Sequence, residues 1–181
     1  MIPSSRAVSS VIGNILMVAI VVILATTVSA FSLGFVDETK QAAAPVVGQS
    51  SGELVTQDGD DGGKISITHI AGDTLSASRL EIAVNAQEAC GKSGRLVNLP
   101  ASGDDLRPTS DYVRGDDIFD NSYNSVSGPI GEAGGQWQAG ETITFRLASS
   151  ECELNSGESV TVRVVHTPTN SVVIEQTLTV K

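Results

Sequence analysis

Positive charge is scarce in this sequence. Lys and Arg number 11 against 21 Asp and Glu, the formal net charge is −10 at pH 7, and the four lysines are Lys40, Lys64, Lys92 and Lys181. Nucleic-acid binding needs a basic patch or stripe to neutralise phosphates, so we predict no nucleic-acid partner. A strongly acidic, lysine-poor surface suits a protein that stays soluble at high salt. The composition therefore favours a halophilic source, although many acidic domains occur in dilute buffers.

The sequence also lacks the motifs of common enzyme chemistry. It contains no Gly-x-Ser-x-Gly elbow, no Gly-x-Gly-x-x-Gly and no P-loop. His69 and His166 are the only histidines, and neither has a Cys or a second His at metal-ligand spacing. Asp58, Asp60 and Asp61 resemble the opening of a calcium loop, but His69 occupies the position where that loop needs a bidentate Glu. We predict no enzymatic activity, no catalytic residue, no metal site and no cofactor.

Formal charge is absent from residues 7–36, and this is the most informative feature. The apolar run 11–35 exceeds the roughly 20 residues that a helix needs to cross a bilayer. A buried helix of a soluble core does not fit, because residues 15–28 are apolar all the way round. An ordinary secretory signal peptide does not fit either, because its apolar region is only about 7–15 residues long. Arg6 before the run and Asp37 after it predict that the rest of the chain is exported.

The residues before the apolar run carry a cleavage motif. A head of five residues leads to Arg6, Ala7 and Val8, so a single charge stands directly against a small residue. The sequence from Arg6 onward reads Arg-Ala-Val-Ser-Ser-Val-Ile-Gly-Asn-Ile-Leu-Met-Val-Ala-Ile. It resembles the N-terminal signature of archaeal, especially haloarchaeal, type IV pilins. The resemblance implies a class III signal peptide that a prepilin peptidase cuts between Ala7 and Val8. Residues 1–7 would be the leader and residues 8–36 the helix of the mature protein.

The sequence departs from two related groups. Ile12 stands where bacterial pilins usually carry a glutamate, and the chain lacks the Gly-Ile-Gly-Thr-type opening of archaellins. Both departures favour an archaeal pilin over a bacterial pilin or a rotary-filament subunit.

Small residues recur along one face of the predicted helix. Thr26, Ala30 and Gly34 lie four residues apart, the spacing that lets helices approach closely. Spacing alone fits equally well a single-pass anchor in which small residues occur by chance. The cleavage motif favours a helix that lies in lipid before assembly and packs against its own copies afterwards.

The composition changes after residue 36. Residues 37–51 predict a helix end and a linker, because Pro45 lacks the N–H that a helix needs. Period-two alternation then predicts about six strands, at residues 52–57, 64–70, 80–84, 142–147, 159–166 and 171–179. Residues 101–140 are rich in Gly, Asp and Ser and predict a long surface excursion. We predict an α+β protein, in which the long hydrophobic helix precedes an antiparallel β-sandwich head (Ig-like or a small barrel) over residues 52–181.

The two cysteines, Cys90 and Cys152, each follow a predicted strand. In an exported chain an even count favours a disulfide. Closing a loop of about 60 residues would stabilise the fold by roughly 4 kcal/mol. Two buried free thiols are the alternative.

Two functions fit these features. The resemblance to pilins implies a structural subunit of an archaeal type IV pilus-like filament that serves adhesion, attachment or biofilm formation. Its partners would be copies of itself, a prepilin peptidase and, before assembly, the membrane. The alternative is a membrane-anchored extracytoplasmic binding module that uses pilin-type export without polymerising. Both readings place the head at the cell surface.

Overall fold

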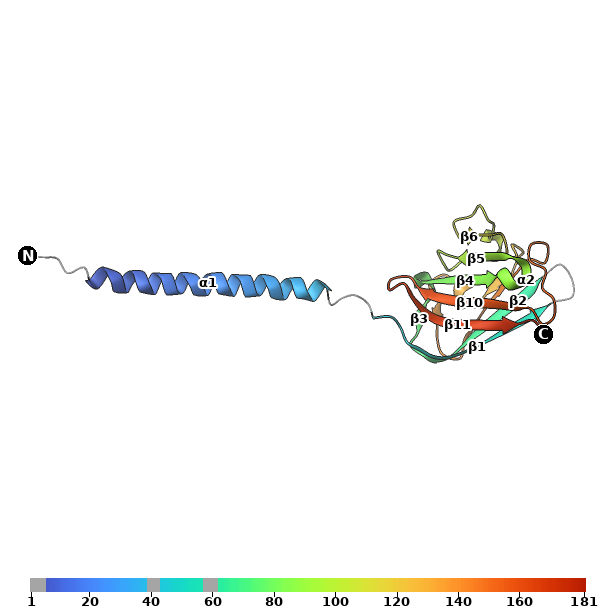
Figure 1. The fold of residues 1–181 in the computed structure, drawn as a ribbon, viewed down its shortest axis with the longest axis horizontal. Coiled ribbons are helices and arrows are strands. Elements are labelled where there is room, and N and C mark those ends of the chain that lie inside the picture. The colour runs from blue at the N-terminus through green and yellow to red at the C-terminus, as the bar shows by residue number, and fades with distance from the viewer. Residues whose placement is uncertain (1–5, 39–42, 57–61) are drawn as a thin grey trace, which may run out of the picture. The chain divides into compact units, whose positions relative to one another are not determined.

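The structure of the chain is a computed structural model that describes residues 6–38, 43–56 and 62–181 (Figure 1). Within the N-terminal helix it describes the side chains of residues 12–29. The chain divides into two compact units, residues 1–42 and 43–181. Residues 1–5 of the predicted leader, and Asp58, Asp60 and Asp61 of the calcium-loop reading, lie outside the described residues.

The N-terminal unit contains the helix α1 (Arg6–Glu38). Its 33 residues correspond to a length of about 50 Å at 1.5 Å per residue. The segment Ile12–Ser29 has a mean hydropathy of 2.3 and none of it is buried. α1 is therefore long and apolar enough to cross the roughly 30 Å hydrocarbon core of a bilayer, as the sequence predicts.

The head unit is built from two antiparallel sheets (Figure 1). The four-stranded sheet has the order β1 (Val47–Thr56), β2 (Gly63–Gly72), β9 (Thr142–Arg146), β7 (Val126–Ser127). The five-stranded sheet has the order β11 (Ser171–Thr179), β10 (Ser159–His166), β4 (Leu80–Ala86), β5 (Lys92–Leu96), β6 (Val113–Gly115). The remaining elements are the pair β3 (Leu75–Ser76) and β8 (Gln136–Trp137), the short helix α2 (Gln87–Cys90), and the 3-10 turns η1 (Ala77–Arg79), η2 (Gly103–Asp105) and η3 (Pro129–Gly131).

Both sheets contribute to one hydrophobic core. Alternate residues of each strand point into it, for example Ile65 and Ile67 of β2 and Val162 and Val164 of β10, all fully buried. This alternation confirms the period-two reading of the sequence and, with it, the α+β fold in which antiparallel sheets follow an apolar helix.

The alternative of a small barrel is wrong, because the sheets do not close. β1 and β11 are edge strands of different sheets. They lie close together, and Gln176 Nε2 donates a hydrogen bond of 2.9 Å to Ser50 Oγ. No backbone ladder joins the two strands. The head is therefore a sandwich with open edges.

The prediction of a long surface excursion at residues 101–140 is also wrong. This segment forms β6, β7 and β8 and places large side chains in the core, namely Leu106, Val113, Ile118, Phe119, Val126, Ile130 and Trp137. Single apolar residues, or pairs such as Ile118-Phe119, that are separated by turn residues leave no periodic pattern in a sequence. At the other end of the head, β1 begins at Val47, five residues before the predicted strand at 52.

Substitutions at two neighbouring residues of β9 should differ strongly in their effect on the free energy of unfolding. Phe145 is fully buried, and its ring meets that of Phe119 edge to face with centroids 6.2 Å apart. Phe145→Ala should lower the free energy of unfolding by about 3–5 kcal/mol. Thr144 is partly exposed on the opposite side of the strand, and Thr144→Ala should cost about 1 kcal/mol or less.

Both values can be measured on the full chain in detergent by denaturant unfolding. Fluorescence of Trp137, the single tryptophan, reports on the head because the residue is fully buried there. Equal losses in the two variants would contradict this placement of the core.

Candidate functional site

The surface of α1 is the first candidate site. All its described side chains are exposed, and the large apolar ones range from 49% exposed at Ile20 to 69% at Met17. Apolar residues cover the helix all round rather than forming one stripe. Such a helix is stable in lipid, or among other apolar helices, and not in water.

The hydroxyl groups of two threonines in α1 have hydrogen-bond partners within the helix. Thr26 Oγ1 donates to the carbonyl of Ile23, and Thr27 Oγ1 donates to the carbonyl of Leu24, both at 2.9 Å. A hydroxyl that is hydrogen-bonded within its own helix avoids the cost of entering an apolar environment without a partner.

The predicted packing face runs along this helix. Thr26, Ala30 and Gly34 all belong to α1, so their spacing of four residues puts them on one side of it. The side chain of Ala30 and the surroundings of Gly34 lie outside the described part of α1. The packing of this face against another helix stays a prediction.

The predicted processing site lies at the start of α1. The helix begins at Arg6, so the bond between Ala7 and Val8 lies in the first turn. The first four N–H groups of a helix have no intrahelical acceptor, so exposing this bond to a peptidase breaks few hydrogen bonds. The side chains of these three residues lie outside the described ones, and cleavage here also stays a prediction.

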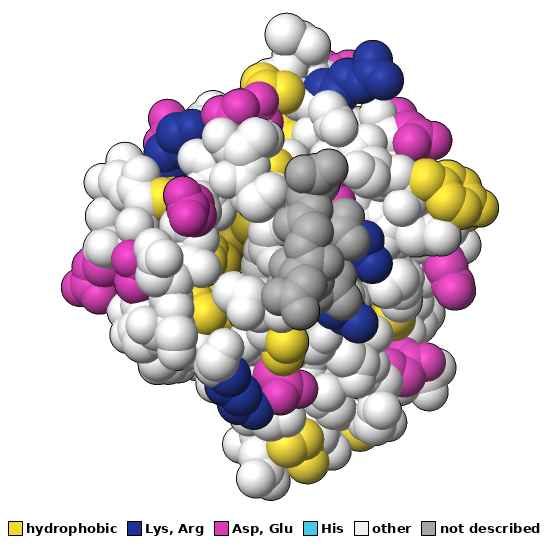
Figure 2. All heavy atoms as spheres, turned by 90° about the vertical axis from the view of Figure 1, so that its right-hand side faces the viewer, with side chains coloured by type: hydrophobic (Ala, Val, Ile, Leu, Met, Phe, Trp, Pro, Cys, Tyr) yellow, Lys and Arg dark blue, Asp and Glu magenta, His cyan; other side chains and the backbone are white. Residues whose placement is uncertain are grey.

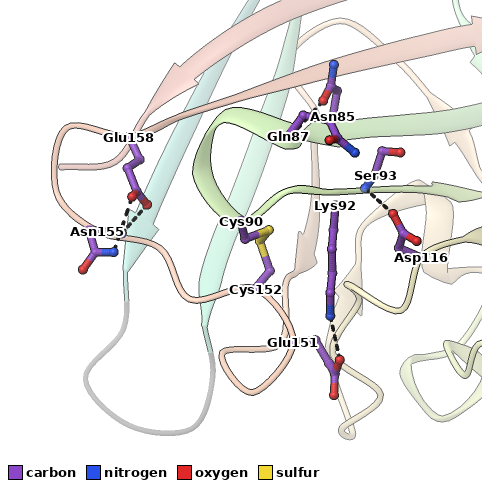
Figure 3. Close-up of a disulfide and its surroundings, with 10 residues drawn as sticks. All are labelled: Asn85, Gln87, Cys90, Lys92, Ser93, Asp116, Glu151, Cys152, Asn155 and Glu158. Carbon is purple, nitrogen blue, oxygen red and sulfur yellow. Dashed lines mark hydrogen bonds and ion pairs between the residues drawn. A yellow bond between two sulfur atoms is a disulfide. The ribbon is translucent and has the colours of Figure 1, made fainter.

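The predicted disulfide is confirmed (Figure 3). It joins Cys90, at the end of α2, to Cys152 in the segment after β9, with Cα atoms 5.3 Å apart and a sequence separation of 62. Cys152 is fully buried in the core. The alternative of two free thiols is therefore excluded.

An ion pair lies beside the disulfide. Lys92 Nζ is 2.9 Å from Glu151 Oε2, so the pair links the start of β5 to the segment that holds Cys152 (Figure 3). The two side chains are 33% and 39% exposed. Because water screens such a pair, it contributes at most about 1 kcal/mol to the free energy of unfolding. Burial and then the charge of Glu151 raise the pKa of the nearby Asp117 carboxyl.

The histidines are strand residues with structural contacts. The ring of buried His69 meets that of Trp137 edge to face at 5.8 Å. His166 Nδ1 lies 2.8 Å from Thr169 Oγ1, and burial, followed by the charge of Arg79, lowers the pKa of His166. Among the residues that the structure describes, no three His, Cys, Asp or Glu side chains are grouped so as to hold a metal ion.

The head surface mixes charges of both signs. Figure 2 shows one face on which Lys and Arg alternate with Asp and Glu and hydrophobic side chains lie scattered. On the five-stranded sheet, by contrast, Arg95, Arg114 and Arg163 line a single hollow. No sequence pattern indicates this group, because the register of strands far apart in the chain brings the three residues together.

Comparison with known proteins points to the same N-terminal segment. Residues 6–48 match the family model described as archaeal type IV pilin, N-terminal. An uncharacterized protein from Archaeoglobus fulgidus is 36% identical over 92 residues, which are 49% of this chain and 61% of that protein. The chain thus spans less than two thirds of the length of this curated relative. α1 and the first residues of β1 are therefore similar to the N-terminal domain of archaeal type IV pilins.

The disulfide predicts a measurable stability difference. It closes a loop across 62 residues of sequence, and removing such a link costs about 4 kcal/mol through the entropy gained by the unfolded chain. The double variant Cys90→Ala/Cys152→Ala should lose roughly this amount, measured by Trp137 fluorescence during denaturant unfolding. Lys92→Gln, which breaks only the adjacent ion pair, should lose about 1 kcal/mol or less. A loss below that of Lys92→Gln in the double variant would contradict the account.

Proposed function

We propose that this chain is a subunit of an archaeal type IV pilus-like surface filament. The observation that carries the proposal is α1, whose 18-residue segment Ile12–Ser29 is apolar and unburied on all sides. The same helix lies within the stretch that is similar to pilin N-terminal domains. In this proposal α1 anchors the exported precursor in the membrane. After cleavage it packs against its copies, while the head faces outward.

The energetics support a helix that exchanges one apolar environment for another. Leaving one Leu, Ile, Val or Met side chain in water costs about 1.5–3 kcal/mol relative to burial. Transfer from lipid to a helix bundle gains no hydrophobic energy, so close packing and small residues at the contact must favour association. Thr26, Ala30 and Gly34 offer such a contact along one side of α1.

The finer parts of the proposal rest on resemblance and composition. A prepilin peptidase would act between Ala7 and Val8, and the filament would serve adhesion, attachment or biofilm formation. The acidic surface, with its net charge of −10, fits a haloarchaeal source. The role is structural rather than enzymatic. A membrane-anchored binding module is the second candidate, because α1 alone also suffices as a single-pass anchor.

Processing supplies the first test of this proposal. The mature protein should begin at Val8, as determined by mass spectrometry of its N-terminal peptide. Ala7→Leu should leave the precursor uncut in the membrane, because a bulky side chain replaces the small residue at the cleavage site. Ala19→Leu, the same change within the apolar segment, should be processed normally. An intact Met1, or a start near Ser32, would argue for another kind of export signal.

Assembly distinguishes the filament subunit from the binding module. Ala30→Leu adds volume where helices are proposed to touch, and overpacking costs about 1–3 kcal/mol at each site. Lipid accepts the larger apolar side chain, so export and processing should stay normal while filaments are lost or shortened. Ala25→Leu is the matched control, because five residues correspond to about 140° around a helix of 3.6 residues per turn.

Electron microscopy and counts of surface filaments give the outcome. Ala25→Leu should assemble better than Ala30→Leu. Equal defects in the two variants would contradict the proposed packing face. If filaments never contain even the wild-type chain although it reaches the surface, α1 is only an anchor and the binding module is correct.

A further inference from the structure

The outer face of the five-stranded sheet carries a transverse row of arginines. Arg163 of β10 is paired with Ala83 of β4, Ala83 with Arg95 of β5, and Arg95 with Arg114 of β6. Adjacent strand residues such as Val164 are buried, so the row projects away from the core. Figure 1 shows the strands of this row side by side in one layer.

This row borders a hollow of about 370 Å³. Its size falls at the lower end of the roughly 300–1,000 Å³ range of small-molecule sites. Ala83 leaves space between Arg163 and Arg95, whose Cα atoms are two strand spacings, or about 10 Å, apart. The other polar groups that line the hollow are the amides of Asn85 and Gln87 and the hydroxyls of Ser93 and Thr161. None of the described residues that line it is acidic.

The row places two positive charges side by side on one face of the sheet. Arg95 and Arg114 face each other across an antiparallel pair, and like charges in this position destabilise a sheet. Three of the six arginines that follow α1 are gathered here, in a chain with a net charge of −10. Such a concentration of positive charge on one sheet face is expected where a function requires it.

Two of the arginines have partners that leave much of the guanidinium free to bind. Arg95 Nη1 donates to Glu81 Oε2 at 3.1 Å, and Arg163 Nη2 donates to Glu175 Oε1 at 3.0 Å. Each of these pairs uses one nitrogen of a group that carries five N–H donors. The hydrogen bond to Glu175, and then its charge, raise the pKa of Arg163. Arg95 and Arg163 are 52% and 45% exposed, so their donors are accessible.

The third arginine is held by backbone groups. Arg114 Nη1 donates to the carbonyls of Ser110 and Val113 at 3.0 and 2.8 Å, and Nη2 lies 4.0 Å from Asp111 Oδ1. These contacts hold the guanidinium beside the hollow. Its positive charge is neutralised only weakly, because an exposed ion pair contributes at most about 1 kcal/mol. Arg114 is 55% exposed.

We propose that this hollow binds an acidic saccharide. Arg95, at the centre of the row, holds a carboxylate or sulfate group of the sugar, and Arg114 and Arg163 flank it. The guanidinium fork matches such oxyanions in geometry and charge. Amide and hydroxyl groups of the lining accept and donate hydrogen bonds to the sugar hydroxyls. This combination of arginines with small polar groups fits a sugar better than an acidic protein surface. The proposal does not depend on whether the chain polymerises.

Calorimetric titration of the full chain in detergent tests this site. The probes are a short oligogalacturonate, a neutral malto-oligosaccharide of equal length, free galacturonate and sodium sulfate. An ionic strength of about 0.15 M limits electrostatic interactions to about 8 Å, so that the arginines of the hollow act while the distant acidic surface is screened. Oligogalacturonate should bind and free galacturonate should bind more weakly. Sulfate and the neutral sugar should bind at least ten-fold more weakly than the oligomer.

Variants assign the binding to the row. Arg95→Gln and Arg163→Gln should each weaken oligogalacturonate binding at least ten-fold. Arg95→Lys, which keeps the charge and loses the fork, should give an intermediate loss. Arg107→Gln is the matched control, because Arg107 is exposed and outside the hollow; its binding should stay within two-fold of the wild type. Cooperative unfolding of all four variants, followed by Trp137 fluorescence, verifies that each keeps the fold.

Several results would overturn the proposal. If Arg107→Gln weakens oligogalacturonate binding as much as Arg95→Gln does, the oligomer is attracted diffusely to the protein surface. If the neutral sugar binds as tightly as oligogalacturonate, the hollow does not recognise the acidic group. Sulfate binding as tight as that of the oligomer would reduce the hollow to a simple ion site. If the wild type binds no saccharide and Arg95→Gln abolishes self-association instead, the hollow is an interface between copies of the chain.

Discussion

The apolar surface of α1 has to be removed from water, and the account of this protein depends on that constraint. From Ile12 to Ser29 the described helix offers no polar side that could face solvent. A soluble monomer would leave side chains such as Met17 and Val28 in water at a cost of about 1.5–3 kcal/mol each. Lipid and a bundle of identical helices both remove this cost. A chain that passes from one to the other can be exported first and assembled afterwards.

The head has a hydrophobic core and a disulfide of its own. Its two sheets share one core, and the Cys90–Cys152 bond ties the end of α2 to the segment after β9. Every large residue of that core comes from residues 54–180. If α1 passes from lipid into a filament, as proposed above, the core of the head does not have to change. The arginine row lies on the outer face of one of these two sheets.

The sequence predicts the features that depend on local pattern and misses those that depend on long-range pairing. The apolar run of α1, the alternation in β2, β4 and β10, and the disulfide were accessible from composition and period. The buried residues of 101–140 could not be predicted, because short apolar pieces such as Ile118-Phe119 and Trp137 are separated by turn residues. The arginine row could not be predicted from the sequence either, because the pairing of Arg95 with Arg114 spans a loop that has no pattern of its own. The processing and packing residues of α1 remain predictions from resemblance and spacing.

The central claim is that α1 leaves the membrane to become part of a filament. Filaments sheared from the cell surface, freed of membrane vesicles on a density gradient and analysed by mass spectrometry, test it most directly. The account predicts that this chain is present in lipid-free filaments, with peptides covering residues 12–29 protected from protease until the filament is dissociated. Recovery of the chain only in the membrane fraction, with none in the filaments, would contradict it.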